Sequence, residues 1–396
     1  MRLKHSLILV FLWISFCGFG QPRQLSPNAK ISVITCGPGQ ELYTSFGHNA
    51  FRVQDQTQGI DWVYNYGTFN FNAPGFYLNF TLGRPLFSLS VSKFSDFLYS
   101  YQFENRWVSE QLLALDQDEK NALFRFLEEN RKPENRSYTY DYLYDNCSTK
   151  IPEVLKKVLG EQLVIPEDSQ GPKPSFRDLI RENLKSNSWS SFGIDLALGA
   201  VIDKKINLRE QMFIPLKVPA QLDNSSLGNK VLVDRGRTIL EATTVSSGFY
   251  FTTSPLFWFV LLLVFTMIIS YIDVKNDVRS RWLDLFLFLL TGSVGLLIFF
   301  LWFITDHSAA ALNFNILWAF PLNLVACYYV IRKGKEFPHW FTKYLLGLMV
   351  MLGLVILLWI IGIQSFSPIL TVLLITLATR YLFLYNYLRK IQPALR

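Results

Sequence analysis

The feature that most constrains this chain is its C-terminal third, which is almost continuously apolar from residue 254 onward. Five stretches there each have about the 20 apolar residues that a helix needs to cross a bilayer core. They cover residues 254–272, 282–304, 314–331, 344–363 and 369–388. The sequence therefore predicts an all-α bundle of five transmembrane helices over 254–388, with a kink at Pro321 and a cytoplasmic tail over 389–396.

Charges in the connecting loops predict the orientation of this bundle. Lys and Arg lie between the first and second spans, between the third and fourth, and after the fifth, whereas 305–313 and 364–368 contain neither. Positively charged loops stay in the cytoplasm, so the C-terminus is predicted to be cytoplasmic and the N-terminal domain to lie outside. The net charge of +7 does not indicate nucleic-acid binding, because much of the excess lies in these loops.

The N-terminus leads to the same orientation independently. Residues 1–20 combine a charged start, an apolar run and small residues near the end, which predicts a secretory signal peptide. The chain is therefore predicted to be a multi-pass protein of the bacterial inner membrane with its N-terminal domain in the periplasm.

Residues 22–247 have the composition of an exported α+β domain. Asp116, with Glu119 three residues later, predicts a capping box at the start of an amphipathic helix over 116–130. Residues 72–83 are an aromatic, loop-like segment whose rings belong either to the core or against lipid. Alternation of apolar and polar residues predicts strands over 31–35, 48–53 and 60–71.

The most informative stretch is 138–160, YTYDYLYDNCSTKIPEVLKKVLG. Its second half predicts a helix capped by Ser148 or Thr149, which puts Cys147 at the helix N-terminus. Free N–H groups and the helix dipole there favour a thiolate, as a nucleophile needs. Two other interpretations remain open, namely a small buried cysteine and a disulfide with Cys36.

A thiol nucleophile needs a base, and His48 is the single histidine of the exported domain. A third group normally orients the imidazole, and Asn65 and Asn70 on the following strand are candidates, with Asn65 preferred. Arg52 and Tyr66, on the same two strands, are predicted to contact substrate. The alternative for His48 is a core or surface histidine with its hydrogen bonds satisfied.

The outer loop between the second and third spans, ITDHSAAALNFNILWAFPLNL, is unusually polar for its membrane depth. Asp306 and His307 are predicted to bind substrate, because polar groups at this depth are costly and often functional. The alternative is that these two lie among lipid headgroups and that Asn313, Asn315 and Asn323 hydrogen-bond between helices.

The order of the two reactive groups carries a resemblance. The histidine strand precedes the cysteine helix, the reverse of papain-like peptidases, and this resembles the circularly permuted NlpC/P60 (papain-like) enzymes, which include acyltransferases of the lecithin:retinol type. The segments ITCGPGQELYTSFGHNAFRV, VYNYGTFNF, PENRSYTYDYLYDNCSTKI and FITDHSAAALNFNILWAFPLNL together resemble the Bacteroidota lipoprotein N-acyltransferases called Lnb. This closer resemblance covers nearly the whole mature chain.

The resemblance implies an exported thiol domain followed by a membrane domain, with Cys147 as the family's cysteine and His48 as its histidine. The family's activity is the addition of an acyl chain to the α-amino group of the lipidated cysteine of lipoproteins. We therefore expect a phospholipid acyl donor, a Cys147 thioester, and the membrane and lipidated N-termini as partners. No cofactor or metal is expected, because the sequence has no metal-ligand cluster, Gly-rich phosphate loop or nucleotide motif.

Two other functions remain open at this point. A cell-wall amidase or peptidase of the NlpC/P60 type would use the same cysteine and histidine, although five spans exceed what anchoring requires. A non-enzymatic membrane assembly protein would carry an inert exported domain, in which both residues are dispensable.

Overall fold

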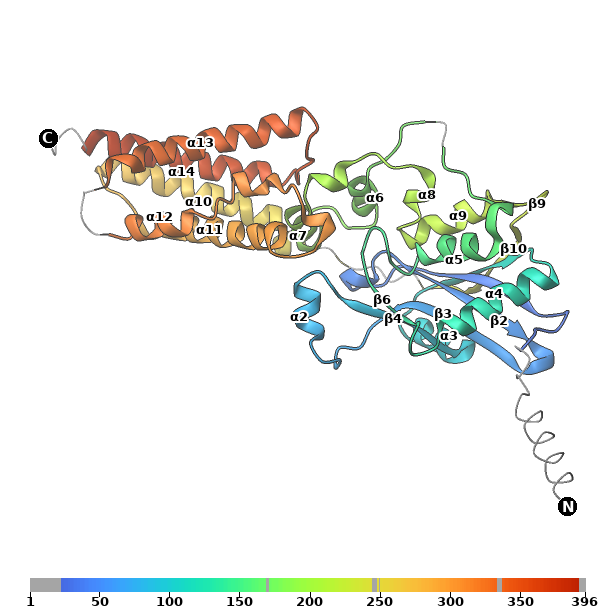
Figure 1. Cartoon of the computed structure of the whole chain (residues 1–396). Helices are drawn as coiled ribbons and strands as arrows, with labels where there is room; N and C mark the ends of the chain where they lie inside the picture. The colour runs from blue at the N-terminus through green and yellow to red at the C-terminus, as the bar shows by residue number, and fades with distance from the viewer. Residues whose placement is uncertain (1–22, 169–170, 244–247, 249, 333–336, 392–396) are drawn as a thin grey trace, which may run out of the picture.

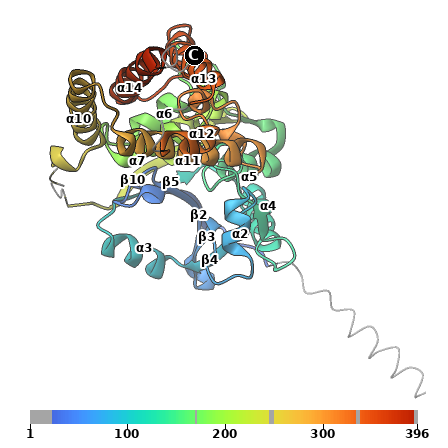
Figure 2. The ribbon, with the colours of Figure 1, turned by 90° about the vertical axis from the view of Figure 1, so that its left-hand side faces the viewer.

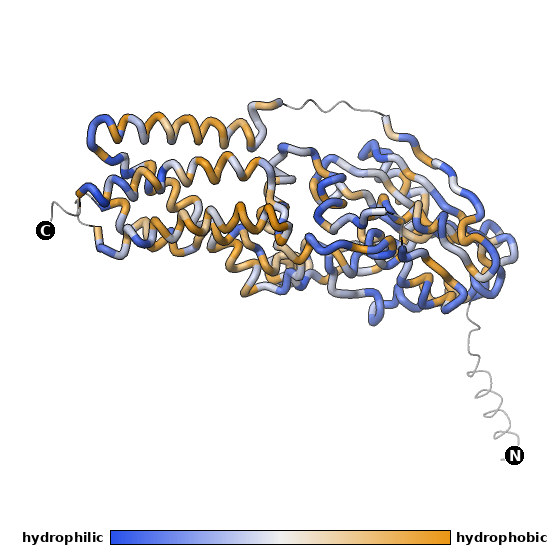
Figure 3. Tube along the Cα trace, turned by 90° about the horizontal axis from the view of Figure 1, so that it is seen from above, coloured by the Kyte–Doolittle hydropathy of each residue, from blue (hydrophilic) through white to orange (hydrophobic). Residues whose placement is uncertain are grey.

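The computed structural model describes residues 23–168, 171–243, 248, 250–332 and 337–391. It joins a sheet-based domain to an elongated helical bundle (Figure 1), and apolar residues dominate the bundle (Figure 3). The predicted mixed α/β domain followed by a helical membrane region is therefore confirmed. The predicted signal peptide and residues 392–396 of the predicted tail lie outside the described residues.

A seven-stranded antiparallel sheet, in the order β10-β5-β1-β2-β3-β4-β6, forms the centre of the N-terminal domain. Its strands are β1 (Lys30–Cys36), β2 (His48–Asp55), β3 (Ile60–Thr68), β4 (Leu86–Lys93), β5 (Val108–Leu113), β6 (Ser137–Thr139) and β10 (Val233–Leu240). A second sheet contains β7 (Leu163–Val164), β8 (Ser226–Leu227) and β9 (Lys230–Val231). The strand predicted to reach residue 71 ends at Thr68, after an irregularity in its pairing with β4.

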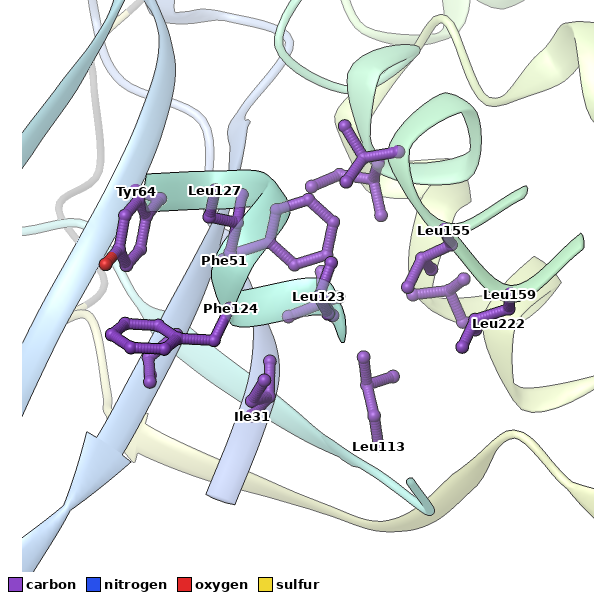
Figure 4. Close-up of a cluster of buried hydrophobic side chains, with 14 of the residues drawn as sticks. Ile31, Phe51, Tyr64, Leu113, Leu123, Phe124, Leu127, Leu155, Leu159 and Leu222 are labelled. Atoms are coloured by element: carbon purple, nitrogen blue, oxygen red, sulfur yellow. The ribbon is translucent and has the colours of Figure 1, made fainter. Parts of the chain in front are cut away.

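Helices cover both faces of the large sheet. On one face, Phe51 and Tyr64, which are register partners, pack with α4 (Gln117–Asn130) and α5 (Lys150–Leu159) in the largest buried cluster of this domain (Figure 4). On the other face, Ile34, Ala50 and Val63 pack with α3 (Phe94–Phe103). The capping box predicted at Asp116 and Glu119 is confirmed.

Four short helices follow α5 in the chain, and they pack on the large sheet or against the bundle. They are α6 (Phe176–Glu182), α7 (Trp189–Ala197), α8 (Leu208–Gln211) and α9 (Val218–Asp223). The segment predicted to be an aromatic loop instead contains a short helix, α2 (Phe76–Thr81), which lies beside the near end of the bundle (Figure 1).

The bundle differs from the prediction in its third span. Four described helices are long and apolar enough to cross a membrane, namely α10 (Pro255–Asn276), α11 (Arg281–Phe303), α13 (His339–Ile360) and α14 (Leu370–Ile391). Residues 314–331 do not form a continuous helix. They contain a 3-10 turn, η8 (Phe314–Leu317), then a bend, and then only the short helix α12 (Asn323–Val330). The described part of the chain thus has four long continuous spanning helices, and the third predicted span is an interrupted segment. This segment still runs the length of the bundle, because the carbonyl oxygens of Val330 and Ile331 accept hydrogen bonds from Arg279 and Arg281 at the start of α11.

Close packing against α11 explains this break. A Cβ on Gly295 would come within 2.0 Å of the Ala319 carbonyl oxygen and 2.7 Å of the Pro321 nitrogen, so the irregular backbone lies directly on α11. Pro321 lies within the break, where its missing N–H removes a helical donor. Non-helical backbone is tolerated at membrane depth where protein covers it, and Trp318 and Ala319 are buried.

The Gly295 contact predicts that two glycine-to-alanine variants of the bundle differ in unfolding temperature. Gly295→Ala should lower the unfolding temperature in detergent by several degrees, because overpacking costs about 1–3 kcal/mol. Gly353→Ala in α13 is the matched control: its Cβ would meet nothing within 4 Å, so its unfolding temperature should stay unchanged or rise. Equal unfolding temperatures for the two variants would contradict this account of the break.

Candidate active site

Cys147 lies in a turn immediately before α5, and a neighbouring asparagine holds that turn. Asn146 Oδ1 accepts hydrogen bonds from the N–H groups of Ser148 (2.8 Å) and Thr149 (3.0 Å). Its Nδ2 donates to the carbonyl oxygen of Phe213 (3.0 Å), which ties the turn to the short-helix region. Asn146, rather than the predicted Ser148 or Thr149, therefore provides the side-chain cap for these N–H groups.

The imidazole predicted to serve Cys147 lies at the same end of the sheet, where β2 begins and β3 ends. His48 Nε2 and Asn65 Oδ1 are 2.5 Å apart. Asn70, the other candidate, accepts a local hydrogen bond from the N–H of Asn72 instead. The structure thus brings Cys147, His48 and Asn65 together and leaves Asn70 out.

A glycine that sequence reasoning missed allows this arrangement. Gly67 has φ +85°, and a Cβ there would come within 3.2 Å of Cys147 Cβ and 3.8 Å of His48 Cε1. Both reactive side chains therefore lie against the bare backbone of β3, where any larger residue would be strained and crowded. The only sequence signal for this was a glycine near the end of a predicted strand.

The electrostatics of the pair favour opposite charges on the two groups. Burial alone would raise the pKa of Cys147, but His48 and the backbone N–H groups of Asn49 and Ser148 lower it overall. Burial opposes protonation of His48, yet Cys147 and Asn65 together raise the pKa of its imidazole. Each charged group therefore stabilises the other, which favours a thiolate paired with an imidazolium.

Cys36 has a different environment although it is the register partner of His48. It is fully buried, and burial raises the pKa of its thiol to about 12. Cys36, Cys147 and Cys327 are all free thiols, so the structure contains no Cys36–Cys147 disulfide. Among the described residues, no group of three His, Cys, Asp or Glu side chains is placed to hold a metal ion.

The two strand residues predicted to contact substrate are structural. Arg52 is 4% exposed, forms ion pairs with Asp61 and Glu110, and lies over the Phe94 ring. Tyr66 is buried in the large core cluster, where its hydroxyl donates to Asn130. Neither side chain leaves a polar group free to face a substrate.

Asp306 and His307, also predicted to bind substrate, form a contact between the membrane and periplasmic parts. Asp306 is ion-paired with Arg84, and its N–H donates to the Leu82 carbonyl (2.8 Å). His307 Nδ1 is 2.8 Å from Thr305 Oγ1, and burial lowers the pKa of the ring. A Cβ on Gly83 would come within 2.6 Å of the His307 nitrogen, so this loop lies tightly against α2.

The asparagines of the outer loop have structural partners, as the alternative interpretation expected. Asn313 Nδ2 donates to the carbonyl oxygens of Leu196 (2.8 Å) and Ala197 (3.1 Å), and Asn315 Nδ2 donates to that of Asp195 (3.0 Å). These carbonyls are at the C-terminus of α7, where no helical N–H is available. Asn323 hydrogen-bonds Thr291 and Tyr344 inside the bundle.

The thiol–imidazole–amide arrangement is suited to nucleophilic attack on a carbonyl carbon, because it combines a stabilised thiolate with a proton donor.

Comparison with known proteins identifies the family of this chain. The model of the Lnb N-terminal periplasmic domain matches residues 22–182, and the model of the Lnb transmembrane domain matches residues 245–391. No curated protein and no solved structure gives a significant match.

The charge balance of the pair predicts the pH dependence of thiol reactivity. In purified full-length protein, Cys147 should react with iodoacetamide well below the pH at which an ordinary thiol ionises. His48→Gln should shift the alkylation profile of Cys147 to higher pH and slow it at least tenfold near pH 7, because burial then opposes the thiolate. Peptide mass spectrometry would measure both rates, with Cys36 expected to stay unmodified as the internal control. An unchanged profile in His48→Gln would rule out the ion pair.

Proposed function

Because the chain belongs to the Lnb family, we propose that it is a lipoprotein N-acyltransferase. It would move an acyl chain from a phospholipid, through a Cys147 thioester, to the α-amine of a diacylglyceryl-cysteine lipoprotein. The observation that carries this proposal is the Cys147–His48–Asn65 arrangement in a periplasmic-type domain directly joined to membrane-spanning helices. We also infer that the C-terminus is cytoplasmic, on the loop charges already described.

In the first half-reaction, the Cys147 thiolate attacks the carbonyl carbon of the ester. A C–S bond forms, the ester C–O bond breaks, and His48 gives its proton to the departing alkoxide of the lysolipid. Among the described residues, none accepts a hydrogen bond from the Cys147 N–H, so this group is available to stabilise the oxyanion.

In the second half-reaction, the lipoprotein amine attacks the thioester. The C–N bond forms, the C–S bond breaks, and His48 takes the proton that the amine loses, which restores the imidazolium and thiolate. Asn65 is a positioning residue, because it holds Nε2 of His48 and thereby directs the other ring nitrogen to the thiol.

A chain segment that leaves the site supports a membrane source for both substrates. This aromatic segment, residues 69–85, connects β3 to β4 and contains α2. Tyr77 is 69% exposed and Leu78 63%, while Phe76 is buried beneath them. The backbone bond from Asp306 holds the segment beside the outer end of α11 (Figure 1). Exposed aromatic side chains beside the outer end of a membrane-spanning helix are typical of residues that enter the lipid interface.

The transfer reaction is tested by the lipid on a lipoprotein N-terminus. In cells that lack other N-acyltransferases, mass spectrometry of the lipopeptide should find the N-linked acyl chain with the wild-type protein and with Cys327→Ala. The chain should be absent with Cys147→Ala and reduced at least a hundredfold with His48→Ala. An unchanged lipopeptide in well-expressed Cys147→Ala would overturn the proposal and favour a cell-wall amidase or an assembly role.

The membrane contact of the aromatic segment is tested by photo-crosslinking in vesicles that contain a diazirine phospholipid. Peptides containing Tyr77 and Leu78 should become labelled. The matched control is α3, which lies farther from the bundle (Figure 1). Its Tyr99 (68% exposed) and Phe103 (82% exposed) are as accessible as Tyr77 and Leu78. Equal labelling of the two helices would show that lipid contact is not specific to the segment.

A further inference from the structure

A large apolar cavity lies outside the site described so far. It has a volume of about 730 Å³ and is lined by α7, α10 and α11, with contributions from Trp318 and Leu373. Every lining side chain is aromatic or aliphatic, including Phe192 and three tryptophans besides Trp318 on the lining helices. A cavity of this size and chemistry within membrane-spanning helices requires a nonpolar occupant.

The cavity exists because α10 and α11 are neighbours in sequence but separate in space. Figure 2 shows α10 beside α14 and apart from α11. At the cytoplasmic end, buried Arg380 pairs with Asp273 of α10 and Asp284 of α11. These buried charges hold the inner ends of the helices together.

At the periplasmic end, the region around α7 holds the start of α10. Trp189 Nε1 donates to the Thr253 carbonyl (2.9 Å), and the N–H of Leu256 donates to Asn187 Oδ1 (3.1 Å). With both ends of α10 fixed, the space between is part of the folded structure rather than a gap that the helices can close.

The dimensions of the cavity discriminate between occupants. Its lining along α11 runs from Trp282 to Val294, a span of about 18 Å at the helical rise. This is close to the thickness of one leaflet's hydrocarbon layer, about 15 Å. No lining side chain is charged, so the cavity offers a lipid headgroup no charged partner. The length and the apolar lining of the cavity therefore match an extended acyl chain.

We propose that this cavity binds an extended acyl chain of a membrane lipid, which enters sideways between α10 and α11 and lies beneath α7. Lipid occupancy follows from the position of the cavity in the membrane region alone. Identifying the bound lipid as a donor or acceptor in acyl transfer rests on the proposed function.

Native mass spectrometry of the full-length protein, released from nanodiscs of palmitoyl-oleoyl phosphatidylethanolamine, tests the proposal. The wild-type protein should retain one lipid per chain. Leu290→Trp and Val294→Trp, which place a large ring in the cavity, should lower retention at least fivefold. Leu357→Trp on α13, 51% exposed and away from the cavity, should retain lipid like wild type.

Three results would overturn the proposal: equal retention in all variants, equal loss in the Leu357→Trp control, or a dimer mass in place of a lipid adduct. Alkylation of Cys147 in each variant shows whether the periplasmic site is still folded. The lipid readout does not depend on catalysis, so the cavity proposal can fail while lipopeptide acylation persists, and acylation can fail while lipid is retained.

Discussion

The interaction on which the rest of the structure depends is the backbone contact between the outer loop of the bundle and the periplasmic domain. The N–H groups of Gly199 and Ala200 donate to the carbonyls of Ala309 and Leu312, each at 2.9 Å. A Cβ on Gly199 would come within 1.9 Å of the Ala311 oxygen, so the two backbone segments meet at a distance that only glycine permits. Because backbone bonds do not adjust through rotamers, this contact fixes the height of the periplasmic domain above the membrane.

The same outer loop reaches the turn that holds the thiol. Ser308 Oγ donates to Asp141 Oδ2 (2.6 Å), and Asp141 forms a backbone bridge with Asp145, two residues before Cys147. The loop therefore contacts both the aromatic segment and the chain leading to the reactive thiol. A chemistry that needs a carbonyl carbon within reach of a thiolate is sensitive to shifts of about 1 Å. This connection would position the thiol relative to the lipid surface as well as to His48.

Local patterns predicted the parts of this structure that depend on local chemistry. The capping box at Asp116 needs only two side chains three residues apart, and the pairing of His48 with Asn65 follows from two adjacent strands. Alternation places Arg52 on the same side of β2 as His48, which is why it was predicted to contact substrate. The two residues are nevertheless four positions apart, about 13 Å along the strand. Nothing local indicated that Asp61 and Glu110 would neutralise it.

Contacts between distant residues explain the other differences. Hydropathy depends only on how many residues are apolar, so it could not distinguish a continuous third span from an irregular segment. That segment packs closely on α11 at Gly295, where there is no side chain. Buried charges at membrane depth are ordinarily a sign of function, yet here Arg380 forms ion pairs with both Asp273 and Asp284. Burying such charges costs free energy that pairing only roughly offsets, so these ion pairs set the positions of the helices rather than add stability. They fix the inner ends of α10 and α11, and the short bonds around Trp189 fix the outer end, so that a space forms where two consecutive helices would otherwise pack together.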